Sequence, residues 1–253
     1  MNAPDRAADV VKVASRAIAR AGLAHAYGHC SVRLDSSQFL VSPAKPLGMI
    51  SRTDLPIRVT IEGPLPPEVL GEVRIHQQIY RSRSNVGGIV RFQSPKLVSL
   101  SALGRSPSVR HGLGSYFAPQ PPFWNDPRLI RDDERAAAVA VTLSAARAIV
   151  LRGNGAVAVG SSLQEACVLS WYLEDTARVE LDVLASGEPG VVFKPAESAD
   201  RATMQGRIFE RMWDWLTRDE LPTEWVPYAL NDFASASALL ASSVVSTPTA
   251  TKV

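Results

Sequence analysis

The sequence contains only two cysteines, Cys30 and Cys167, and their separation fits no zinc-binding spacing. Two isolated cysteines in a chain of 253 residues are typical of reduced thiols, so we expect a cytoplasmic location. The N-terminal segment has no apolar run long enough for a signal peptide or a membrane span, which predicts no membrane partner. Net charge is also scarce: the formal value of +2 is too small to indicate nucleic acid as a partner.

The composition that is present is that of a globular protein, with 46% hydrophobic and 21% charged residues. Helical patterns alternate with short strand patterns, and no repeat or interdomain linker is visible, which favours one α/β domain. We assign this domain to residues 1–220. Residues 221–253 drift into Ala, Ser and Thr, so we expect a C-terminal segment that ends in a loosely held tail.

Hydrophobic periodicity and turn residues place the individual elements. They predict strands over 27–34, 38–43, 56–63, 87–92, 148–151 and 156–159. They predict helices over 7–21, 68–81, 96–103, 132–146, 163–187 and 199–216. Between them, residues 105–127 are rich in Gly, Pro and aromatic residues, and ordered loops of that length usually have a function.

Four segments, in this order along the chain, carry a resemblance to a known family. They are GHCSVRL (28–34), FLVSPAKP (39–46), EVRIHQQIYRSRSNVGGIVRFQSP (72–95), and LRGNG (151–155) with the capped helix that follows it. Together they resemble the class II aldolase/adducin family over roughly residues 7–220. The resemblance implies an α/β class II aldolase-like fold of three layers, with a central, mostly antiparallel sheet flanked by helices. It also implies a homotetramer with active sites between subunits.

The family's three metal-binding histidines are absent from the matching positions. Arg91, Gln93 and Asn154 stand there instead. Neutral amide oxygens suit a divalent ion poorly unless carboxylates join them, and a guanidinium is always protonated and repels a cation. We therefore predict that the site binds no metal, and no other cofactor is expected.

The same replacements suggest a substitute for the metal. Arg91 would hold a substrate carboxylate or stabilise an enolate-like oxygen, and Gln93 and Asn154 could donate amide hydrogens to that oxygen. Glu72 or His29 would carry the proton. In the alternative reading, Glu72 and Arg91 neutralise each other as a buried ion pair, and His29 is a turn histidine bonded to backbone.

Three further residues are candidates for substrate binding. Ser42 and Lys45 lie where the family often grips an anion, and Tyr228 could reach the pocket of a neighbouring subunit. A surface role for Lys45 and simple packing for Tyr228 are the alternatives. His76 follows Glu72 by four residues and shares its helix face, so we expect it to pack against the core.

These residues predict a metal-independent lyase that acts on a small, anionic hydroxy- or oxo-carboxylate. The reaction would be decarboxylation or a retro-aldol-like cleavage of a C–C bond. The pair Gly28-His29 resembles the branch of the family that contains decarboxylases of hydroxylated aromatic acids, which adds aromatic acids to the expected substrates. The alternative is a non-catalytic, adducin-like protein that serves assembly or ligand binding. Polar rather than apolar residues at the lost ligand positions favour the enzyme.

Overall fold

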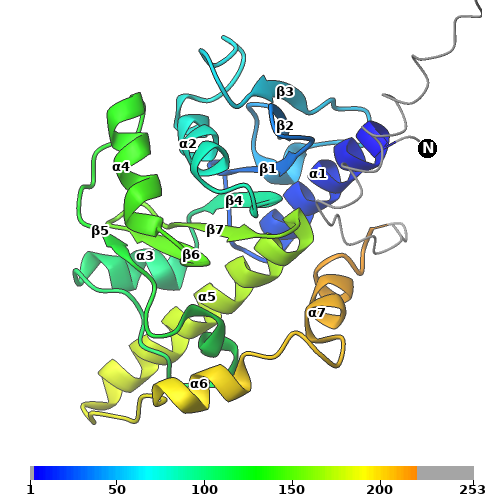
Figure 1. Cartoon of the computed structure of the whole chain (residues 1–253). Helices are drawn as coiled ribbons and strands as arrows, with labels where there is room; N and C mark the ends of the chain where they lie inside the picture. Colours follow the sequence, from blue (N-terminus) through cyan, green and yellow to red (C-terminus); the bar gives the residue numbers. More distant parts are fainter. Residues whose placement is uncertain (1–2, 221–253) are drawn as a thin grey trace, which may run out of the picture.

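The computed structural model describes residues 3–220, and within them one seven-stranded sheet forms the centre of the molecule (Figure 1). The strands are β1 (His29–Arg33), β2 (Gln38–Val41), β3 (Ile57–Thr60), β4 (Gly88–Phe92), β5 (Phe123–Trp124), β6 (Ala148–Leu151) and β7 (Ala156–Gly160). Their order across the sheet is β3-β2-β1-β4-β7-β6-β5. Neighbours are antiparallel except β5 and β6, which are parallel. The expected central, mostly antiparallel sheet is confirmed.

Helices cover both faces of this sheet and make the expected three layers (Figure 1). One face packs against α1 (Ala3–Arg20), α3 (Pro95–Ala102) and α5 (Leu163–Ser186). The other face packs against α2 (Arg74–Ser82) and α4 (Asp133–Leu143). Three 3₁₀ turns, η1 (Leu47–Met49), η2 (Gly71–Val73) and η3 (Gly112–Phe117), and two later helices, α6 (Pro195–Arg201) and α7 (Ile208–Leu216), complete the described elements.

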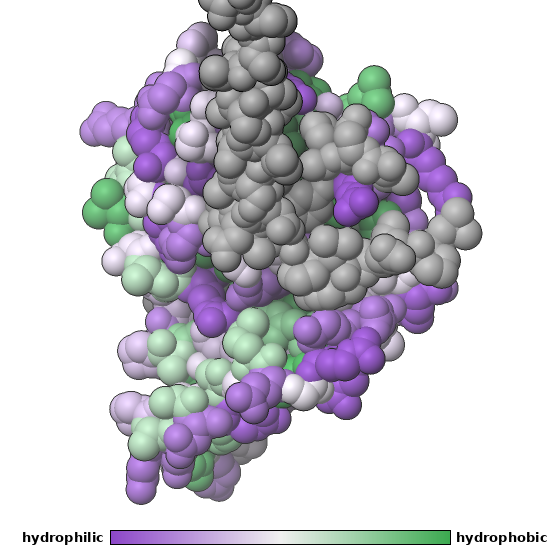
Figure 2. All heavy atoms as spheres, turned by 45° about the vertical axis from the view of Figure 1, so that its right-hand side comes forward, coloured by the Kyte–Doolittle hydropathy of each residue, from purple (hydrophilic) through white to green (hydrophobic). Residues whose placement is uncertain are grey.

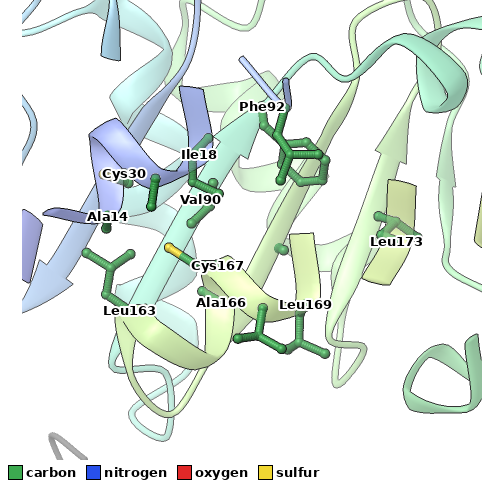
Figure 3. Packing of buried hydrophobic residues seen from close by; sticks show 14 of the residues in the cluster. Ala14, Ile18, Cys30, Val90, Phe92, Leu163, Ala166, Cys167, Leu169 and Leu173 are labelled. Atoms are coloured by element: carbon green, nitrogen blue, oxygen red, sulfur yellow. The ribbon is translucent and has the colours of Figure 1, made fainter. Parts of the chain in front are cut away.

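Alternation of side chains along the strands divides the interior into two cores. In β1 and β4, Cys30, Val90 and Phe92 pack with Ala14 of α1 and Cys167 of α5 (Figure 3). The residues between them face the opposite side, where α2 lies. On that side the apolar pattern is interrupted by buried polar residues at the ends of the two strands. The sheet therefore presents a polar site to α2 and a wholly apolar surface to α1 and α5.

Two of the predicted helices differ from those observed. The helix expected over 68–81 begins at Arg74, because the chain first forms η2 after an extended Leu70. The helix expected over 199–216 is two helices, α6 and α7. Gly206 and Arg207 separate them with φ of 72° and 54°, and consecutive left-handed residues cannot continue a right-handed helix.

Three further expectations concerned the segment 105–127, the C-terminal tail and the membrane. The long segment 105–127 contains η3 and β5 rather than loop alone. The expected tail over 221–253 lies outside the described residues. No helix among residues 3–220 is long and apolar enough to cross a membrane.

On the face drawn in Figure 2, hydrophilic and apolar side chains are interspersed.

Candidate active site

A cavity of about 520 Å³ opens on the α2 side of the sheet, at one end of β1 and β4. Sheet register explains why its residues meet: His29 of β1 lies directly opposite Arg91 of β4. Gln93 follows β4, and the turn between β6 and β7 brings up Asn154. The polar side chains that line the cavity are those of His29, Lys45, Glu72, Arg91, Gln93, Arg131 and Asn154, together with Tyr27.

Arg91 forms a buried ion pair with Glu72. Its Nη2 lies 3.0 Å from Oε2 of Glu72, and the Arg91 side chain is 2% exposed. Glu72 is held from the other side by the backbone N–H of Ile130, which donates to Oε1 at 3.5 Å. Burial lowers the pKa of Arg91, whereas the neighbouring Glu72 raises it. The contact that the sequence offered as the alternative reading is therefore present.

The two amides that replace the family's ligands lie beside this pair. With its oxygen turned toward Arg91, Gln93 accepts from Nη1 at 3.1 Å and from Nη2 at 3.3 Å. The same end of the Gln93 amide is 2.5 Å from the side-chain amide of Asn154. Gly155, with φ of 78°, allows the turn that carries Asn154 to lie close to the end of β4. A Cβ on Gly155 would lie 2.0 Å from the carbonyl oxygen of Phe92.

These three positions do not fit a divalent metal ion. A guanidinium points among the groups that would have to bind the cation, the two amides already bond to each other, and Gln93 also bonds to that guanidinium. Over residues 3–220, no group of three His, Cys, Asp or Glu side chains is placed to hold a metal ion. The donor set is instead suited to hydrogen-bonding an anion.

His29 bonds to a histidine that the sequence assigned to packing. Its Nδ1 lies 2.9 Å from Nε2 of His76, whose Nδ1 lies 2.6 Å from Oγ of Ser31. Burial lowers the pKa of His76 to about 3 and that of His29 well below 6.5, and the adjacent Arg91 adds to both shifts. Both rings are therefore neutral at pH 7. The hydrogen-bond partner of His29 is a side chain rather than the backbone of a turn. The Nε2 atom of His29 is buried and has no hydrogen-bond partner within residues 3–220.

The remaining predicted residues lie in three different situations. Lys45 lines the cavity, but its Nζ bonds both carboxylate oxygens of Asp54 at 2.8 Å. Ser42 is buried outside the cavity lining, where its Oγ accepts from the backbone N–H of Cys30 at 3.3 Å. Tyr228 lies outside the described residues. Of these three, only Lys45 is on the cavity wall in the described part of the chain.

Sequence reasoning missed the residues around the cavity mouth. Arg131 lines the cavity, and its guanidinium forms no ion pair with the described residues. Tyr27, Leu70 and Leu129 form an apolar rim, with exposures of 71%, 41% and 49%. No periodic pattern marks these loop positions. The cavity therefore combines a polar floor with an apolar rim and a cation at its mouth.

Comparison with known families defines the class of protein. Residues 9–181 match the family described as Class II Aldolase and Adducin N-terminal domain. The chain therefore belongs to this family, as the four ordered segments predicted. Two solved structures share the fold. They are L-fuculose 1-phosphate aldolase from Glaciozyma antarctica PI12 (TM-score 0.73, 21% identity, 85% of this chain and 88% of that chain) and an aldolase II superfamily protein from Pseudomonas syringae (TM-score 0.70, 19% identity, 87% and 94%).

Two curated relatives have names that state a specific activity. The chain is 25% identical over 196 residues to a 3,4-dihydroxyphthalate decarboxylase of Terrabacter sp. (strain DBF63), covering 70% of this chain and 81% of that protein. It is 24% identical over 200 residues to a protein of the same name from Arthrobacter keyseri, covering 72% and 80%. Both names describe lyases that act on an aromatic carboxylate.

Proposed function

We propose that this protein is a lyase that decarboxylates a small, hydroxylated aromatic carboxylate without a metal ion. The observation that carries the proposal is the cavity itself, whose apolar rim suits an aromatic ring and whose polar floor suits its oxygen substituents. The names of the two curated relatives support the same substrate class.

Charge pairing around the cavity suggests how such a substrate is oriented. Lys45 and Arg91 are each paired with a carboxylate, Asp54 and Glu72. Arg131 forms no ion pair within residues 3–220, so it is the cation available to an incoming anion. An ion pair with the carboxylate that is lost would stabilise the ground state and oppose the reaction. We therefore assign Arg131 to a carboxylate that stays on the ring.

The floor of the cavity suits the charge that develops during decarboxylation. A ring hydroxyl ortho or para to the carboxylate gives up its proton, and the ring carbon that bears the carboxylate takes a proton. The bond between that carbon and the carboxyl carbon then breaks, carbon dioxide leaves, and the released electron pair restores the aromatic ring and the negative charge on its oxygen. Arg91 and the amides of Gln93 and Asn154 supply a buried positive charge and hydrogen-bond donors for that oxygen, as a metal ion would. Glu72 is positioned as the group that accepts and returns a proton.

The direct test is an assay on protein that has been dialysed against a chelator. Hydroxylated benzoates and phthalates are offered as substrates, and carbon dioxide release is measured together with the ultraviolet spectrum of the ring. We expect turnover of at least one dihydroxyphthalate, unchanged by chelation. Activity that disappears with the chelator and returns with a divalent ion would show that the metal-free proposal is wrong. Absence of turnover across the panel would refute decarboxylation.

Arg131 gives a sharper prediction with a matched control. Arg131→Gln should raise KM by about tenfold or more and leave kcat much less affected, because one charge-assisted contact of about 1.5–3 kcal/mol is lost in binding. Arg128→Gln, three residues earlier, removes a guanidinium that is already bound to Asp126 and does not line the cavity. Equal KM values for the two variants would rule out the assigned role of Arg131.

The closed pair between Arg91 and Glu72 favours a second candidate, a non-catalytic protein that binds a small anion. Calorimetric binding of a dihydroxyphthalate without any turnover would identify this case. In either case we propose a homotetramer with sites between subunits, as the family resemblance implies. Light scattering that finds a stable monomer at micromolar concentration would overturn the proposed assembly.

A further inference from the structure

We propose that Tyr80, Ser31 and His76 are positioning residues, which hold His29 as the tautomer whose proton lies on Nε2 and faces the cavity. The four side chains form one continuous chain of hydrogen bonds through the layer between β1 and α2. The distances are 2.9 Å from Tyr80 to Ser31, 2.6 Å from Ser31 to His76 and 2.9 Å from His76 to His29.

The proton on the Tyr80 hydroxyl sets the direction of this chain. Tyr80 is 2% exposed, and Ser31 Oγ is the one acceptor within reach of its hydroxyl among the described residues. Arg33 stacks over the Tyr80 ring at 4.6 Å, but a guanidinium has no lone pair to offer. Tyr80 therefore donates to Ser31.

Each further bond then follows from the previous one. Ser31 has a single proton, and with Tyr80 donating to it, that proton goes to Nδ1 of His76. A neutral His76 that accepts at Nδ1 carries its own proton on Nε2, which it donates to Nδ1 of His29. A neutral His29 that accepts at Nδ1 carries its proton on Nε2. Burial keeps both imidazoles in the neutral form, since it lowers the pKa of each ring.

The reverse direction leaves a buried donor without a partner. If His29 donated from Nδ1, then His76 would donate to Ser31, and Ser31 would donate to the Tyr80 oxygen. The Tyr80 proton would then have no acceptor in the described part of the chain. Burying an unpaired hydroxyl proton is unfavourable. In the forward direction the last proton, on His29 Nε2, is also buried and has no partner among the described residues, but His29 lines the cavity, where a ligand oxygen can accept that proton.

A consequence for the reaction rests on the proposed function. Fixed in this tautomer, His29 is a neutral hydrogen-bond donor and not a general base. The substrate group above it must be an acceptor, such as a carboxylate or phenolate oxygen, and His29 keeps its proton while bonding to it. Acceptance of a proton is then left to Glu72. In this arrangement His29 is the hydrogen-bond donor and Glu72 is the proton acceptor.

The tautomer can be read directly without any substrate. The chain has four histidines, so ¹⁵N spectra of the imidazole rings are small, and His25→Gln and His111→Gln assign two of them. We expect a protonated, pyrrole-type resonance for Nε2 of His29 and an unprotonated, pyridine-type resonance for Nδ1 in the free protein at pH 7. The opposite pattern would overturn the proposal.

Two variants test whether the chain of hydrogen bonds is the cause. Ser31→Ala removes the link that fixes His76, so the His29 Nε2 resonance should shift toward the pyridine type as the second tautomer becomes populated. Tyr80→Phe removes the donor that sets the direction, so the His29 Nε2 resonance should shift the same way. The shift should be smaller than in Ser31→Ala, because the Ser31 proton still has Nδ1 of His76 as an acceptor. A Ser31→Ala spectrum with no shift would refute the positioning role.

Activity separates this inference from the proposed function. If a substrate is found, Ser31→Ala should lower kcat by about tenfold or more with little change in KM, and Tyr80→Phe should lower it much less. A fixed tautomer without decarboxylase activity would leave the inference standing and remove the proposed reaction. Decarboxylase activity in a protein whose His29 has the opposite tautomer would support the proposed reaction and refute the inference.

Discussion

Arg91 places a permanent positive charge inside the sheet layer, and the ion-pair partner that the described residues provide for it is Glu72. An ion pair taken out of water is expensive to break on one side only, because the remaining charge stays buried without compensation. The pair also fixes the guanidinium where Gln93 can accept from it. Its removal should therefore affect the whole floor of the site.

The first residue-scale prediction concerns this pair. Arg91→Met should lower the free energy of unfolding by about 3–5 kcal/mol, because the Glu72 carboxylate, whose side chain is 16% exposed, loses its cation. Combining it with Glu72→Gln should recover much of that loss, and urea unfolding of the four proteins gives the coupling. Arg128→Met, which removes an arginine side chain that is 68% exposed, serves as the control and should leave the unfolding midpoint almost unchanged. Strictly additive single effects would contradict the pairing.

Sequence reasoning identified the floor of the site better than its mouth. The residues that it named on the strand ends and turns do line the cavity: His29, Glu72, Arg91, Gln93 and Asn154. Family segments and sheet pairing bring these residues together, so spacing along the chain was informative. Arg131 comes from a loop whose path no periodicity determines. The contact of His76 with His29 depends on the rotation of α2 above the sheet, which the helix pattern alone leaves open.

At the scale of elements, close backbone contacts hold the turn that carries Asn154. Gly155 adopts φ of 78°, and a Cβ on it would lie 2.0 Å from the carbonyl oxygen of Phe92. Gly153, two residues earlier in the same turn, has φ of 64° but open space around it. The two glycines thus share a left-handed conformation and differ in packing, which makes them a matched pair.

This pair gives the second prediction. Gly153→Ala should cost about 1–2 kcal/mol, from the left-handed conformation alone. Gly155→Ala should cost a further 1–3 kcal/mol or so, because the chain must move away from β4. It should also displace Asn154 from Gln93, which ligand binding would report. Chemical denaturation of both variants measures the difference, and equal losses would show that the close contact has no energetic role.

Element boundaries were predicted less well than element types. The six predicted strands and the helices over 96–103, 132–146 and 163–187 were recovered within a few residues, since strong periodicity and caps such as Ser162 mark them, whereas the two-residue strand β5 was not predicted. The merged helix over 199–216 ignored Gly206, which was visible in the sequence as a breaker. The start at residue 68 was too early for α2, because Gly71 and the η2 turn precede it.

For the molecule as a whole, two neutral histidines in the interior couple folding to pH. The folded pKa of His76 is about 3 and that of His29 is also far below 6.5, the usual value that the unfolded chain restores. Below pH 6.5 the unfolded state therefore binds more protons than the folded state. Stability is fully present above that pH and is lost as the pH falls toward the folded pKa values.

The third prediction follows from that sign. From pH 6.5 downward, each of the two histidines should lower the free energy of unfolding by up to about 1.4 kcal/mol per pH unit. Urea unfolding between pH 7 and pH 4.5 measures the slope. His76→Gln should reduce the slope, while His25→Gln, at an exposed position, should leave it unchanged. A slope that is the same in all three proteins would show that the buried imidazoles do not control acid stability.

The two edge strands of the sheet also affect the tendency of the protein to aggregate at high concentration. Among the described elements the edges are β3, four residues long with Arg58 and Thr60 exposed, and β5, which is only two residues long. Short edges that carry a charge offer few free backbone groups to a strand from another molecule. The native protein should therefore resist fibril-like aggregation through its sheet edges. Aggregation on storage or overexpression should begin from unfolded chains.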